Sequence, residues 1–143
     1  MTANAGGPLH RAQVLGSRAV AWLLLGLIHL SIRLLGVGRT FRCLARLSPR
    51  PIDGRAPPRE VLVRVARTVN LARNSTPAFC LRRALLIWWL LRWWRADARI
   101  HCDMGPALGH AWVELEGQVI GDRADLAGSG RFGDFGRIFG VRP

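Results

Sequence analysis

The feature that most limits the fold is a run of residues, Ala84 to Leu91, that is apolar on every side of a helix. It follows a typical helix start, in which Ser75 or Thr76 can cap the helix and Pro77 can occupy its first turn. A helix without a polar face is stable only in the interior of a protein. The rest of the chain is therefore expected to surround this helix.

Cys80 lies in the first turn of this helix if Thr76 is the cap. The helix dipole and the unpaired N–H groups at that end favour a thiolate, and the backbone N–H of Cys80 could support an oxyanion. The chain has three cysteines and no CxxC pair, which argues against a disulfide framework or a zinc ribbon. We therefore interpret Cys80 as a candidate nucleophile in a reducing cytoplasm, with a buried structural thiol as the alternative.

A second constraint comes from the residues that follow His110, which alternate between two faces as in a strand. Gly117 marks a hairpin turn. A three-residue loop over 116–118 would place Asp122 on the same face as His110 and within side-chain reach, whereas a two-residue loop would place it on the opposite face. We predict the three-residue loop and a His110–Asp122 pair, in which the carboxylate orients the imidazole.

The N-terminal part is predicted to be helical. The apolar run 19–32 lies between Arg18 and Arg33 and is shorter than the about 20 residues of a membrane span. It is expected to be a buried or partner-facing helix, with membrane contact as the alternative. Residues 1–10 look like a loose terminus. Further helices are expected at 40–47 and 60–73, on either side of a Pro-rich loop.

The length of 143 residues predicts a single domain, 1–143, in which 1–56 form the N-terminal helices and the Pro-rich loop and 57–143 form the core. A further strand is predicted at 98–102, and 123–143 reads as a loop with a short packed segment. The expected class is α+β, with the Cys80 helix buried against a small antiparallel sheet.

Two motifs resemble the transglutaminase-like cysteine peptidases. They are Thr76-Pro77-Ala78-Phe79-Cys80-Leu81-Arg82-Arg83-Ala84-Leu85 and, 30 residues after Cys80, His110-Ala111-Trp112-Val113-Glu114-Leu115-Glu116-Gly117, followed by Asp122. More narrowly, this set is similar to the lasso peptide biosynthesis B2 proteins. The match is good over about residues 60–125, and Gly109 stands where that family more often has Ala.

The resemblance implies a papain-like core and a peptidase that removes the leader from a ribosomally made lasso precursor peptide. Cys80 would be the nucleophile, His110 the general base and then acid, and Asp122 the orienting carboxylate. The implied partners are the precursor, a small leader-binding B1 protein, for which the apolar N-terminal helix is a candidate contact, and the ATP-dependent lasso cyclase. No metal, organic cofactor, nucleic acid or stable membrane insertion is expected.

Other functions remain open from the sequence. The same triad could transfer the acyl group to an amine, as in a transglutaminase-type crosslinker. The chain has 21 basic and 9 acidic residues, and its net charge of +12 with six Trp could instead indicate a non-enzymatic module that binds a membrane or nucleic acid. A metal site among Cys80, Cys102, His101, Asp103 and His110 matches no regular ligand spacing. Asn70 and Asn74 are conceivable second oxyanion donors.

Overall fold

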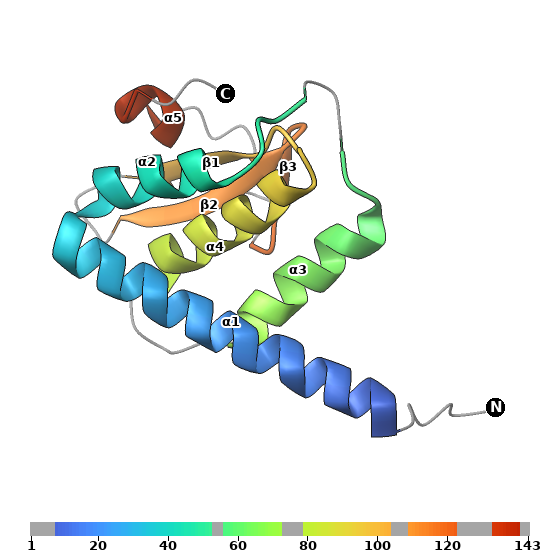
Figure 1. The fold of residues 1–143 in the computed structure, drawn as a ribbon. Coiled ribbons are helices and arrows are strands. Elements are labelled where there is room, and N and C mark those ends of the chain that lie inside the picture. The colour runs from blue at the N-terminus through green and yellow to red at the C-terminus, as the bar shows by residue number, and fades with distance from the viewer. Residues whose placement is uncertain (1–7, 53–55, 73–78, 104–108, 123–132, 141–143) are drawn as a thin grey trace.

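The computed structural model describes residues 8–52, 56–72, 79–103, 109–122 and 133–140. These residues form four main helices, a four-stranded antiparallel sheet and a short C-terminal helix (Figure 1). The elements are α1 (Pro8–Leu35), α2 (Val37–Leu47), α3 (Arg59–Leu71), α4 (Phe79–Trp93), β1 (Arg99–Asp103), β2 (His110–Leu115), β3 (Gln118–Ile120), β4 (Gly133–Asp134) and α5 (Phe135–Ile138). The predicted α+β class is confirmed.

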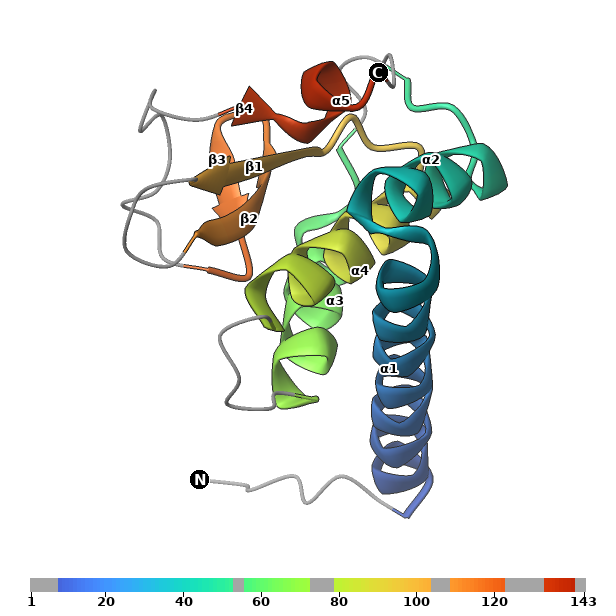
Figure 2. The ribbon, with the colours of Figure 1, turned by 90° about the vertical axis from the view of Figure 1, so that its left-hand side faces the viewer.

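Helix α4 is the centre of the core. It contacts α1, α2 and α3 and also packs against β1 and β2, so that it lies between the other helices and the sheet (Figure 2). Leu85, Leu86 and Leu91 have no exposed surface, and Ile87 is 1% exposed. The all-round apolar character of the run is thus explained by neighbours on several sides, as expected.

The C-terminal end of α4 carries a buried cation. Arg92 is 6% exposed, and its Nε donates a hydrogen bond of 2.8 Å to the hydroxyl of Ser48, which directly follows α2. The guanidinium carbon also lies 5.1 Å from the ring centroid of Trp88, a cation–π arrangement. These contacts tie the end of α4 to the end of α2.

The sheet has the strand order β3-β2-β1-β4, with neighbouring strands antiparallel. The side chains of Ala111, Val113 and Leu115 on β2 are buried, and β2 has the more extensive contact with α4. His101 on β1 lies opposite Trp112 on β2, and their rings are stacked with centroids 5.9 Å apart. The sheet therefore covers α4 with the face that carries Ala111, Val113 and Leu115. His101, Trp112 and His110 lie on the other face.

Three boundaries differ from those expected. Helix α1 begins at Pro8, so residues 8–10 are helical and not part of a loose terminus; Pro is well tolerated in a first helical turn. Helix α2 begins at Val37, directly after Gly36, whose φ of 79° separates it from α1. Helix α3 runs from Arg59 to Leu71 and not over 60–73, with Pro58 as its N-cap. The predicted capping of α4 by Ser75, Thr76 and Pro77 lies outside the described residues.

Replacement of Leu86 by Ala tests the central position of α4. Leu86→Ala leaves a cavity in a fully buried site and is expected to lower the free energy of unfolding by about 2–5 kcal/mol. Leu47→Ala, the same change at a residue that is 66% exposed, is expected to alter it by less than about 0.5 kcal/mol. Urea denaturation followed by circular dichroism measures both; similar losses in the two variants would contradict the described packing.

Candidate active site

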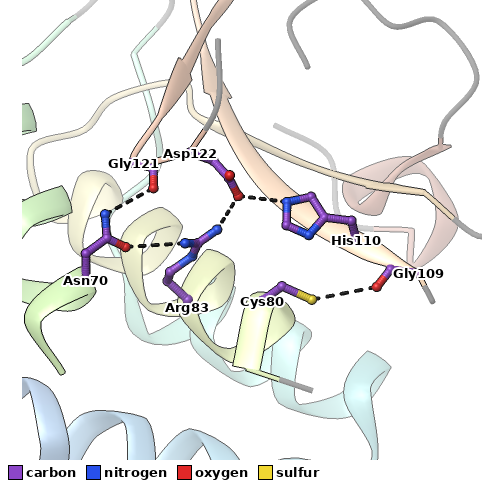
Figure 3. A network of polar contacts seen from close by, with 7 residues as sticks. All are labelled: Asn70, Cys80, Arg83, Gly109, His110, Gly121 and Asp122. Carbon is purple, nitrogen blue, oxygen red and sulfur yellow. Dashed lines mark hydrogen bonds and ion pairs between the residues drawn. The ribbon is translucent and has the colours of Figure 1, made fainter. Parts of the chain in front are cut away.

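Cys80 is the second residue of α4 and is half-buried. Its Sγ lies 3.7 Å from the backbone carbonyl oxygen of Gly109, to which the thiol can donate a hydrogen bond (Figure 3). The thiol is therefore held next to the first residue of β2. A thiol at the start of a helix also lies among N–H groups that have no partner within the helix.

Gly109 occupies its position because the backbone of Asp103 comes very close. A Cβ at Gly109 would lie 2.8 Å from the carbonyl oxygen of Asp103, a separation that real Cβ atoms hardly ever show. Since the carbonyl group of Gly109 faces Cys80, an Ala at this position would displace a contact of the thiol. The departure from the family pattern at Gly109 thus has a steric reason in this chain.

His110 begins β2 and carries its ring between Cys80 and Asp122 (Figure 3). Its Nε2 lies 2.8 Å from Oδ2 of Asp122, and the His110 side chain is 35% exposed. A carboxylate at Nε2 favours the tautomer in which Nε2 carries the proton, so Nδ1 is left with a lone pair. Nδ1 is on the side of the ring that faces Cys80 (Figure 3). The ring is further supported by stacking on Trp112, at a centroid distance of 6.2 Å.

The predicted hairpin register is wrong, although the His110–Asp122 contact is present. Leu115 pairs with Gln118 and not with Val119, so the connection is a two-residue turn and not a three-residue loop. Both turn residues, Glu116 and Gly117, have positive φ, at 51° and 77°, as a tight primed turn requires. A continued ladder in this register would turn the side chain of Asp122 away from His110.

Gly121 removes this conflict, because it ends the ladder. Strand β3 ends at Ile120, and Gly121 has a φ of 75°, a conformation that redirects the chain before Asp122. The carbonyl oxygen of Gly121 accepts a hydrogen bond of 3.1 Å from Nδ2 of Asn70 on α3. The position of Asp122 is thus determined by a left-handed residue and by α3 as well as by strand register.

Arg83 is part of this network and was not predicted from the sequence. Its guanidinium forms an ion pair with the Oδ2 of Asp122 that His110 also contacts, and it donates a second hydrogen bond of 3.4 Å to Oδ1 of Asn70 (Figure 3). Arg83 follows Cys80 by three positions, a spacing that places two side chains on one face of a helix. That spacing from Cys80 is the signal that could have revealed it.

The amide of Asn70 is engaged within this network. It donates to Gly121 and accepts from Arg83, so the suggested role of Asn70 as an oxyanion donor is not what its contacts indicate. In Figure 3 it lies beyond Arg83 as seen from Cys80. Asn74, the other candidate, lies outside the described residues.

The other two cysteines have different surroundings. Cys43 is exposed on α2. Cys102 is buried in β1, and burial, together with the negative charge of Asp103, raises the pKa of its thiol. A raised pKa keeps a thiol in its less reactive, protonated form. Of the three, Cys80 is the thiol beside the His110–Asp122 pair.

The acidic residues of β2 and its turn do not replace Asp122 as the partner of His110. Glu114 lies 3.8 Å from Nε2 of His101, on the neighbouring strand, and Glu116 lies in the turn. Within the described part of the chain, no three His, Cys, Asp or Glu residues gather in a way that could hold a metal ion. The arrangement that remains is a thiol, an imidazole and a carboxylate.

Two glycine variants test the close packing at Gly121, the residue before Asp122. Gly117→Ala and Gly121→Ala both force a side chain into a left-handed conformation, which costs about 1–2 kcal/mol. The added Cβ at Gly121 would also lie 3.1 Å from Cδ1 of Ile87 and 3.2 Å from Cβ of Ala66, whereas nothing lies within 4 Å at Gly117. Gly121→Ala is therefore expected to lower the free energy of unfolding by about 1 kcal/mol more than Gly117→Ala. Urea denaturation measures the difference, and equal losses would contradict the close packing at Gly121.

A comparison with known protein families identifies the superfamily of this chain. A family model described as the transglutaminase-like superfamily matches residues 24–132. No curated protein and no solved structure shows a significant match. The superfamily includes cysteine peptidases and acyltransferases and typically performs cysteine-based catalysis. Because the match covers well over half of the chain, including all three residues of the site, this protein belongs to the transglutaminase-like superfamily.

Proposed function

We propose that this protein is a cysteine peptidase that removes the leader from a ribosomally made lasso precursor peptide. The observation that carries the proposal is the His110 ring, whose Nε2 is bound by Asp122 at 2.8 Å while Nδ1 faces Cys80 (Figure 3). Covalent catalysis of acyl transfer needs a nucleophile, a base that activates the nucleophile, and a group that orients the base.

The proposed reaction begins with proton transfer from Sγ of Cys80 to Nδ1 of His110. The thiolate then attacks the carbonyl carbon of the scissile peptide bond, and the C–N bond breaks to leave a thioester on Cys80. His110 returns its proton to the departing amine, then takes a proton from water as the water attacks the thioester. The C–S bond then breaks, which releases the leader as a carboxylic acid, and the proton on His110 returns to Sγ of Cys80. Asp122 accepts the hydrogen bond from Nε2–H and stabilises the charged ring in both halves of the reaction.

The rest of the proposal relies on the sequence motifs. The residues from Cys80 to Leu85 and from His110 to Gly117 resemble the lasso B2 proteins, which supports a leader peptide as the substrate. The proposed partners are the precursor, a small leader-binding B1 protein and the ATP-dependent lasso cyclase, in the cytoplasm. Thiol proteolysis of this kind consumes no cofactor, because the nucleophile, the base and water supply every atom and proton that is transferred.

Replacement of Cys80 tests the reaction directly. The full chain is incubated with a lasso precursor peptide and a small leader-binding B1 protein, and the products are weighed by mass spectrometry. We expect a leader fragment with the wild type and with Cys43→Ala, which removes an exposed thiol on α2 that is not part of the candidate site. We expect no leader fragment with Cys80→Ala. Since Cys80 is only half-buried, the variant should keep its thermal unfolding midpoint.

Cleavage that persists in Cys80→Ala would overturn the proposal. A product joined to an amine, with loss of the amine leaving group and no incorporation of water, would instead identify an acyltransferase that uses the same three residues.

A second prediction concerns Arg83, which we propose to be a positioning residue for Asp122. Arg83→Gln removes a charge-assisted bond worth about 1.5–3 kcal/mol, so Asp122 is less firmly held against His110. We expect kcat for leader cleavage to fall about tenfold or more, with a smaller change in KM. Arg83→Lys, which keeps the charge but not the fork that reaches Asn70, is expected to be intermediate.

The matched control is Arg64→Gln, which removes the same charge from an exposed position of α3. Equal losses in the two Gln variants would show that net charge matters and that the contact with Asp122 does not.

A further inference from the structure

Helix α1 has two apolar faces, and the fold covers one of them. Ala21, Leu25 and Ile28 are 3–5% exposed and belong to the core. On the opposite side, a second set recurs at helical spacing and is 52–73% exposed: Val20, Leu23, Leu27, Leu30 and Leu34. We call this second set the outer stripe of α1. It extends for about 21 Å along the helix. Contiguous exposed apolar surface of this kind marks an interaction site.

The outer stripe lies at the periphery of the molecule. In Figure 2, α1 lies on the side opposite the sheet, with α3 and α4 between them. Its inner face contacts α2, α3 and α4. The outer stripe therefore faces away from the sheet that carries His110, and it can be covered without covering the candidate active site.

The surroundings of the outer stripe are positively charged. Residues 1–52 contain seven Arg and no acidic residue. Arg18 and Arg33 are exposed on α1 itself, and Arg39, Arg42 and Arg46 are exposed on α2. Trp22, 41% exposed, lies on α1 next to this stripe. An apolar helix face with Arg and an aromatic residue beside it is typical of helices that lie in the interface of an anionic membrane.

We propose that the outer stripe docks α1 onto the surface of an anionic phospholipid bilayer, parallel to the membrane plane. The segment Arg18–Leu35 is long and apolar enough to cross a membrane by length and composition. A spanning α1, however, would have to leave the core, because Ala21, Leu25 and Ile28 are packed into it. Docking through the outer stripe keeps these contacts.

Charge favours an anionic bilayer over a second copy of this chain, and the apolar side chains favour it over nucleic acid. A second copy of this chain would bring two molecules of net charge +12 together along their Arg-rich sides, which opposes association. Nucleic acid would neutralise the charge of the Arg side chains but would leave the five apolar side chains of the outer stripe in water. An anionic bilayer supplies negative headgroups for the Arg side chains and an apolar layer for the outer stripe.

Sedimentation with lipid vesicles tests the proposal on the full-length protein. We expect the wild type to sediment with vesicles that contain phosphatidylglycerol, to remain in solution with vesicles of phosphatidylcholine alone, and to dissociate from the former at high salt. The combined variant L23Q/L27Q/L30Q is expected to bind at least about tenfold more weakly. All three side chains are more than half exposed, so the variant should keep its circular dichroism spectrum and unfolding midpoint.

Two matched controls isolate the outer stripe. L47Q/V63Q/L71Q changes three exposed apolar residues on α2 and α3 and is expected to bind vesicles as the wild type does. R18Q/R33Q is expected to weaken binding more than R64Q/R67Q, which removes the same charge from exposed positions of α3.

Several outcomes would overturn the proposal. One is no sedimentation with anionic vesicles, and another is equal binding to both kinds of vesicle. A third is a protein that is dimeric without lipid and becomes monomeric in the L23Q/L27Q/L30Q variant, which would assign the outer stripe to a second copy. A fourth is unchanged vesicle binding in that variant together with loss of binding to the leader-binding protein, which would assign the outer stripe to that partner.

Discussion

The burial of α4 is the constraint on which the rest of the fold depends. Because Leu85, Leu86, Ile87 and Leu91 point in different directions and all are excluded from water, one neighbouring layer could not have covered them. The sheet covers one side and the other helices cover the rest. Near the start of α4, Cys80 and Arg83 lie where the helix meets the start of β2 and the end of the β2–β3 hairpin.

The carboxylate of Asp122 joins the parts of this site. It contacts an imidazole from the sheet and a guanidinium from α4, while the residue before it is bound by an amide from α3. A carboxylate between two nitrogen donors has little freedom to rotate, which fixes the tautomer of His110. Members of the superfamily typically perform cysteine-based catalysis, and this geometry brings together the thiol, imidazole and carboxylate that such chemistry needs.

Much of the fold could be predicted from the sequence, because the spacing of hydrophobic residues indicates helices and strands, and Gly and Pro indicate where these elements end. The buried α4, the strand at His110 and the α+β class followed from such patterns. The hairpin register did not, because Gly117 is compatible with loops of two or three residues and the choice also depends on Gly121 packing against Ala66 and Ile87. The spacing of Arg83 from Cys80 indicates that the two side chains share a helix face, but its contacts with Asn70 and Asp122 depend on tertiary structure.

The order of the site residues along the chain has a consequence for protein synthesis. Cys80 leaves the ribosome well before His110 and Asp122, since the N-terminus is made first. A nascent or truncated chain that ends within β1 therefore carries the thiol without the groups that would activate it. Cys80, His110 and Asp122 come together only when β2 and β3 have paired and Gly121 has docked on α3, so the site is assembled only when folding is complete.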